Sequence, residues 1–152
     1  MANVFDPEWD GEQDKGPFQW RRARIGGQAG ARDLGASLYE IPPGGSTFPL
    51  HFHHANEEMA IVLVGRPTLR TLDGERELSP GEAVAFQPGR DGAHRLDNRT
   101  DEPVRVVILS TMRAPEIVDY PESRKIGLAS IQTGLRKILP ADRELDYFDG
   151  EL

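Results

Sequence analysis

Three histidines and one glutamate are spaced so that they could hold a metal ion. His51 and His53 are separated by one residue, so on a β-strand their side chains lie on the same face. Glu58 follows after four further residues, and His94 lies well along the chain. Three imidazoles and one carboxylate suit borderline divalent metals such as Mn, Fe, Ni, Cu or Zn. We therefore predict a metal site formed by His51, His53, Glu58 and His94.

Such a ligand set would leave room for a reaction at the metal. A metal that prefers six ligands keeps two neighbouring positions open, where a substrate could chelate or where O₂ and a substrate could bind together. The carboxylate lowers the net charge of a divalent ion, which reduces the free-energy cost of burying it in an apolar pocket.

The segments that must position these residues are expected to be short β-strands. The chain has 16 Gly and 12 Pro in 152 residues, spread along its length, which is typical of an all-β domain with frequent turns. Asp73 and Gly74 form a strong type I′ hairpin signal. Short strands at such intervals indicate a sandwich or a barrel. The expected strands are 36–41, 48–53, 59–64, 68–72, 75–78, 83–86, 94–98 and 104–110.

Strand geometry predicts how the four residues could meet. A hairpin-like return after His53 would bring Glu58 beside the two histidines, and Ala60 and Val62 would then line the same interior. His94 must come from a third strand.

Two neighbours compete for roles in this site. His54 has the wrong strand parity to join His53, so we expect it at the surface. Glu57 is an alternative to Glu58 as the carboxylate ligand, but the spacing to Gly65 favours Glu58.

Composition excludes several classes of protein. A net charge of −7 disfavours binding of nucleic acid through a basic surface. The absence of Cys excludes disulfides and thiolate chemistry. The first residues lack a secretory pattern, and no apolar run approaches the roughly 18 residues of a membrane helix. We expect a cytoplasmic protein without a nucleic-acid or membrane partner.

The length favours one domain with extended ends. Residues 1–18 are acidic and are expected to form an N-terminal arm. The barrel is expected over 19–115, and 116–152 should form a C-terminal extension packed on or beside the barrel. Within this extension, 131–139 could be a strand or a short helix.

The two histidine-bearing segments resemble the two sequence motifs of the cupin superfamily. The first motif, G(X)5HXH(X)3–4E(X)6G, matches at Gly45, His51, His53, Glu58 and Gly65. The second, G(X)5PXG(X)2H(X)3N, matches at Gly81, Gly89, His94 and Asn98.

The second motif departs from the family pattern at two points. Gln87 stands in the place of the proline, with Pro88 one position later, and four residues separate Gly89 from His94. The chain otherwise looks most like small single-domain bacterial cupins of the conserved-barrel type. The resemblance implies a double-stranded β-helix, a jelly-roll barrel, with one divalent ion (Zn, Ni, Mn or Fe) per chain and with His51, His53, Glu58 and His94 as its ligands.

Several functions remain open for such a protein. It could be a metal-dependent enzyme of the oxygenase, decarboxylase or isomerase type, acting on a small organic molecule in the barrel. The alternatives are a non-catalytic small-molecule binding or sensor cupin and a storage role. No catalytic acid or base is identified, and Tyr39 and Glu40 are weak candidates. Paired cupin sheets often associate, so we expect a homodimer. The apolar stripe Met59, Ile61 and Leu63 is then either the dimer surface or part of a second core.

Overall fold

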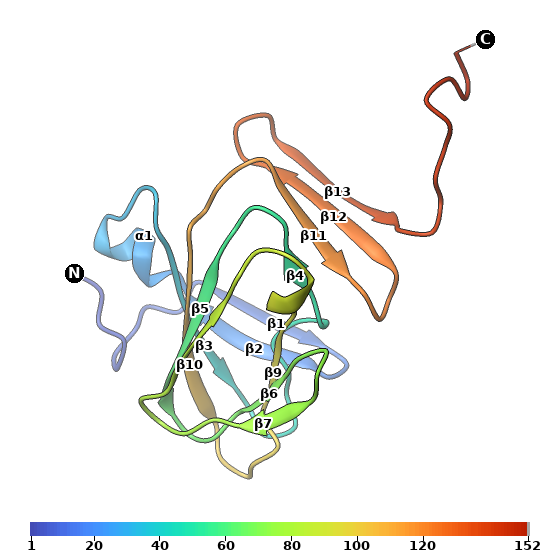
Figure 1. Ribbon diagram of the computed structural model, residues 1–152. Helices are drawn as coiled ribbons and strands as arrows, with labels where there is room; N and C mark the ends of the chain where they lie inside the picture. The colour runs from blue at the N-terminus through green and yellow to red at the C-terminus, as the bar shows by residue number, and fades with distance from the viewer. Residues whose placement is uncertain (152) are drawn as a thin grey trace.

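The computed structural model describes residues 1–151, which form three antiparallel β-sheets (Figure 1). The six-stranded sheet has the order β1 (Gly11–Lys15), β2 (Phe18–Ala23), β3 (Gly35–Ile41), β10 (Val104–Ser110), β5 (Glu58–Val64) and β8 (Ala83–Phe86). The three-stranded sheet has the order β7 (Glu75–Glu77), β6 (Thr68–Arg70) and β9 (Arg95–Asp97). The four-stranded sheet has the order β13 (Leu135–Pro140), β12 (Lys125–Ser130), β11 (Glu116–Tyr120) and β4 (Phe52–His53).

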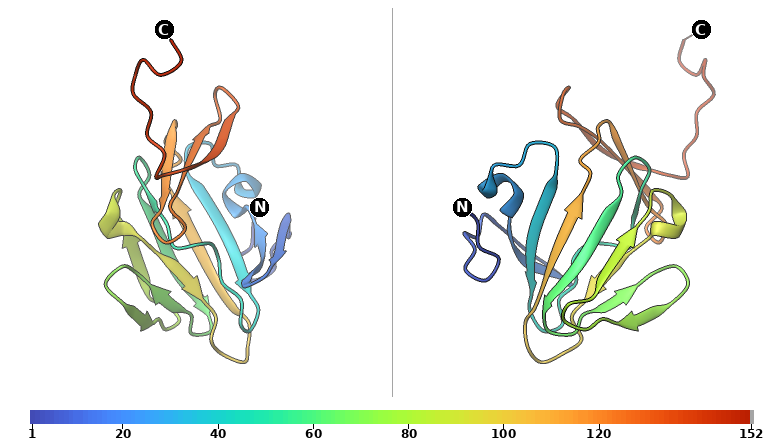
Figure 2. Two further views of the ribbon diagram at one scale, coloured as in Figure 1. Left: turned by 90° about the vertical axis from the view of Figure 1, so that its right-hand side faces the viewer. Right: turned by 60° about the vertical axis from the view of Figure 1, so that its left-hand side comes forward.

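The main hydrophobic core lies between the six-stranded and the three-stranded sheets, which face each other across the barrel (Figure 2). Side chains alternate between the two faces of a strand, so in β10 Val104 and Val106 point into this core while Val107 points away from it. Ala60 and Val62 of β5 are 0% and 1% exposed, as expected for residues on the side of Glu58. The all-β class is confirmed, and the arrangement is a double-stranded β-helix.

The outer face of the six-stranded sheet carries a second core. Leu38 and Val107 pack there with Ile25 of the short helix α1 (Ile25–Ala29), and Trp9 of the N-terminal segment covers them. Leu63 joins this cluster, so that part of the expected apolar stripe is core. The N-terminal segment is held because β1 pairs along its whole length with β2.

The C-terminal part of the chain forms regular strands that the sequence did not reveal. β11 and β12 were not predicted. For 131–139 the sequence allowed a strand or a short helix, and the structure has a strand there, β13 (Figure 1). β11 pairs with β4, so this sheet adjoins the segment that carries His53. No helix within residues 1–151 has the length and apolar character needed to cross a membrane.

Several expected strands are shorter than predicted, and the largest difference is at 48–53. Of 48–53, only Phe52 and His53 form a regular strand, and the residues before them bend. Pro49 has no N–H to donate to a sheet, which disfavours a longer ladder. His51 is held instead by an isolated antiparallel bridge to His94.

Candidate metal site

The bridge between His51 and His94 brings two of the histidines together. Their backbones bond in both directions, with His94 N–H donating to His51 O over 2.9 Å and His51 N–H to His94 O over 3.4 Å. Residues directly opposite in an antiparallel pair project to the same face, so the two rings lie 4.7 Å apart between centroids. A distant segment thereby supplies the third histidine.

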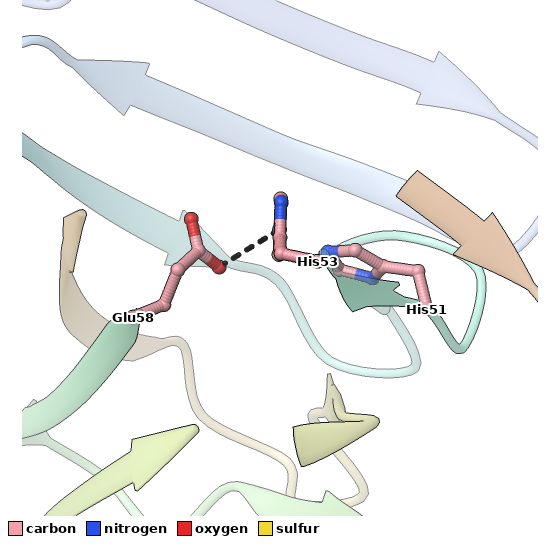
Figure 3. A group of neighbouring side chains, drawn as sticks. All are labelled: His51, His53 and Glu58. Carbon is pink, nitrogen blue, oxygen red and sulfur yellow. Dashed lines mark ion pairs between the residues drawn. The ribbon is translucent and has the colours of Figure 1, made fainter. Parts of the chain in front are cut away.

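Glu58, the first residue of β5, points its carboxylate at the ring of His53 (Figure 3). Its Oε2 lies 3.3 Å from Nε2 of His53 and 3.3 Å from Nε2 of His94. Potential ligand atoms of His51, His53 and Glu58 all lie within 4.8 Å of one another. The centroids of the His94 and His53 rings lie 6.4 Å apart, and both rings reach the same Glu58 oxygen.

Each imidazole is oriented by a hydrogen bond at Nδ1. His51 Nδ1 lies 2.9 Å from the carbonyl of Pro49, and His94 Nδ1 lies 2.9 Å from that of Gly92. A carbonyl can only accept, so both rings carry their proton on Nδ1 and leave the Nε2 lone pair available. This tautomer is the one that metal-binding histidines with a supporting acceptor adopt.

The longer loop before His94 closes into a compact turn. Arg90–Gly92 forms a short 3₁₀ helix, η1, and the His94 ring stacks on Phe86 with centroids 3.8 Å apart and planes 8° apart. A Cβ on Gly92 would lie 1.9 Å from the carbonyl oxygen of Gln87, so only glycine allows this close approach. The two additional residues are therefore absorbed without moving His94 away from Glu58.

One nitrogen at the centre of the site has no hydrogen-bond partner. His53 Nε2 is buried and makes no hydrogen bond, although Glu58 Oε2 lies 3.3 Å away. An unsatisfied buried nitrogen destabilises the folded protein unless another group binds it. A divalent cation would satisfy this nitrogen, and the chemistry of the donor set fits such an ion.

The electrostatics favour a neutral His51 beside an ionised Glu58. Burial, followed by repulsion from His94 and His53, lowers the pKa of His51 to about 3. Burial tends to raise the pKa of Glu58, but its interactions with His53 and His94 outweigh burial and hold that pKa well below its usual value. Burial tends to lower the pKa of His53, whereas attraction by Glu58 and Glu116 raises it overall.

Sequence reasoning missed two buried polar residues behind His53. Glu116 at the start of β11 is 9% exposed, and its Oε2 lies 3.3 Å from His53 Nδ1. Asn56 is 5% exposed and donates its amide to the same carboxylate. Neither residue has a motif spacing in the sequence. The only available signal was the alternation of Glu116, Val118 and Tyr120, which is typical of one face of a strand.

Other residues considered from the sequence lie outside this cluster. His54 is exposed, and Glu57 is an exposed acid that accepts a hydrogen bond from Gln87. Glu40 forms ion pairs with Arg21 and Arg105 and does not line the cavity that adjoins the histidine cluster.

A cavity of about 430 Å³ adjoins the cluster, which is in the usual range for small-molecule pockets. The barrel contributes Tyr39, Phe48 and Ile108 to its wall. The C-terminal sheet contributes Val118 and Tyr120. The wall is therefore mainly apolar, and His51, His53 and Glu58 are among its polar residues.

Comparisons with known proteins agree with this geometry. Residues 37–110 match the family model of the cupin domain. A protein from Silicibacter pomeroyi described as a sugar phosphate isomerase from a cupin superfamily has 23% identity and a TM-score of 0.82, covering 98% of both chains. The polyketide cyclase RemF from Streptomyces resistomycificus has 24% identity and a TM-score of 0.62, covering 76% of this chain and 82% of that one.

A third solved structure adds to the agreement in fold. A Cupin 2 conserved barrel domain protein from Salinispora arenicola has 22% identity and a TM-score of 0.53, covering 72% of this chain and 92% of that one. No curated protein matches the sequence. The family model spans both histidine segments and the same barrel fold is found in these structures, so residues 37–110 form a cupin domain.

Proposed function

We propose that this chain is a metal-dependent enzyme acting on a small, oxygen-bearing organic molecule in the cavity. His51, His53, Glu58 and His94 would hold one divalent ion, Zn, Ni, Mn or Fe. The observation that carries the proposal is the unsatisfied, buried Nε2 of His53, which faces the Glu58 carboxylate among imidazoles that are all fixed through Nδ1. When bound, such an ion would act as a Lewis acid toward an oxygen atom of the substrate.

The residues of the cavity suit binding and proton handling. Burial raises the pKa of the Tyr39 phenol, so Tyr39 keeps its proton at neutral pH and can donate a hydrogen bond to a bound oxygen. The apolar wall, which includes Phe48 and Ile108, excludes water and strengthens such contacts. Two of the similar structures are described as an isomerase and a cyclase, which favours catalysis on oxygen-rich molecules.

Metal content and turnover together test the proposal. The purified protein should contain close to one divalent ion per chain by elemental mass spectrometry. The metal-loaded protein should then exchange carbon-bound hydrogen for deuterium in D₂O, or consume O₂, with sugar phosphates or 1,3-dicarbonyl compounds. Tyr39→Phe should slow turnover while retaining the metal.

Other outcomes would contradict parts of this assignment. A protein that binds no divalent ion would exclude the metal site. Metal binding with ligand-induced thermal stabilisation but no turnover would instead identify the binding or sensor alternative. The homodimer and the cytoplasmic location stay predictions, and sedimentation analysis would check the homodimer.

A further inference from the structure

We infer that Glu116 is a positioning residue of the metal site, which fixes the tautomer and orientation of His53 and joins the C-terminal sheet to the metal centre. This inference rests on the proposed metal binding. Glu116 lies outside the segment that carries the two cupin motifs, in strand β11.

The two oxygens of Glu116 have separate partners. Oε1 is held by the backbone and lies 2.8–3.3 Å from three N–H groups. Oε2 accepts from the side chains of His53 and Asn56. The three backbone donors to Oε1 are those of His54, Ala55 and Ile117.

These contacts determine which ring nitrogen of His53 carries the proton. Oε1 accepts from three backbone N–H groups and Oε2 accepts from Asn56, so both oxygens act as acceptors and His53 Nδ1 donates to Oε2. The lone pair is then on Nε2, the buried nitrogen that faces Glu58. A carboxylate behind a ligand histidine orients the ring and increases its basicity toward a metal.

Asn56 donates a second hydrogen bond to Oε2 of Glu116, so this oxygen must act as an acceptor. Asn56 Oδ1 accepts from Thr111 Oγ1 over 2.9 Å and from the Arg113 backbone N–H over 2.5 Å. Its amide nitrogen must therefore turn toward Glu116 and donate. A group at Oε2 thus meets two donors, one from Asn56 and one from His53.

Strand β11 also contacts the segment that carries His51 and His53, both through backbone pairing and through a side chain beyond Glu116. Val118 of β11 pairs with His53 of β4, and Tyr120 lies 6.0 Å from His51 between ring centroids. Coupling between two sites is reciprocal. A metal that binds His53 should therefore also stabilise β11 through Glu116.

Replacement of Glu116 by glutamine tests this inference directly. If the Gln oxygen keeps the three backbone N–H groups, its NH₂ group replaces Oε2 and faces the donors of Asn56 and His53. His53 would then shift its proton to Nε2 and lose its metal-binding lone pair. We expect Glu116→Gln to weaken Zn²⁺ binding about 10–100-fold in calorimetric titrations of the full chain.

Asp119→Asn is the matched control, because it makes the same change of charge on the same strand. Asp119 pairs with Phe52 and does not line the cavity, so Zn²⁺ affinity should remain close to that of the wild type. Glu116→Asp keeps the acceptor chemistry with a shorter reach and should recover part of the lost affinity. Equal affinities for the wild type and Glu116→Gln would overturn the inference.

Hydrogen–deuterium exchange separates positioning from a general structural role. In the wild type, Zn²⁺ should slow amide exchange in 116–120 as well as around His53. In Glu116→Gln, saturating Zn²⁺ should no longer protect 116–120, although the metal-free barrel strands should exchange as in the wild type. Loss of protection throughout the metal-free barrel would show that Glu116 acts only on folding. Absence of Zn²⁺ binding in the wild type would instead refute the proposed function.

Discussion

The barrel strands and the C-terminal sheet both border the site, but they differ in how much of their surface is buried. In β5, the residues facing the core, Ala60 and Val62, are almost fully buried. All six residues of β13 are exposed, and its neighbour β12 is buried only at two positions. Glu58 thus comes from a well-packed barrel strand, whereas His53 and the Glu116 behind it belong to the peripheral sheet. The site therefore draws on both regions, although the buried core lies mainly in the barrel.

The largest expected effect is on the free energy of unfolding, for which we compare a core residue of the barrel with a residue of the C-terminal sheet. Leu96 of β9 is fully buried in the main core, and Leu96→Ala should lower the free energy of unfolding by about 2–5 kcal/mol. Ile138 of β13 is 56% exposed, and Ile138→Ala should change the free energy of unfolding by less than about 0.5 kcal/mol. Urea denaturation measures both values. Similar losses would show that β13 is buried in solution, for example in a dimer.

The next effect concerns a ligand from the barrel. His94→Ala removes one of the proposed metal donors, so Zn²⁺ affinity should fall by more than about 100-fold, beyond the range for a supporting residue. His54→Ala is the control, because that side chain is exposed and should leave the affinity unchanged. Elemental analysis after dialysis gives a second measure. If both variants lost the metal equally, the assignment of the ligands would be wrong.

The smallest effect is a pH dependence that arises at His53. Its pKa is raised above 6.5, so in the metal-free protein His53 is protonated at and below that pH, and the proton competes with the metal. Zn²⁺ affinity should fall about tenfold for each pH unit below this pKa. His51 should not contribute near neutral pH, because its pKa is about 3. A flat affinity profile between pH 5 and 8 would contradict this prediction.

The sequence indicated the barrel and the cluster of His51, His53 and Glu58 because both depend on patterns within short segments. Strand alternation placed His51 and His53 on one face, an expected hairpin-like return placed Glu58 beside them, and the resemblance to a family placed His94. The strand 104–110 was predicted with the bounds that β10 has in the structure. These features require only short-range regularity or a known motif.

The remaining features could not be predicted because they depend on contacts between distant segments. Glu116 is a single acid after a proline, and its importance follows from the pairing of β11 with β4, which joins residues more than 60 positions apart. The bend before His51 replaced an expected strand, since the bridge to His94 was not visible in either segment alone. Periodicity reveals the faces of a strand but does not identify its partner.

The free edge of the C-terminal sheet has a consequence for the behaviour of the protein in concentrated solution. Within residues 1–151, β13 pairs with β12 on one side and with no strand on the other. An open edge with exposed aliphatic residues invites addition of a strand from another molecule and hence fibre formation. Arg136, Lys137 and the closing Pro140 lie along this edge. Positive charges repel an identical edge, and a proline cannot donate to a continuing ladder, so the strand itself opposes aggregation.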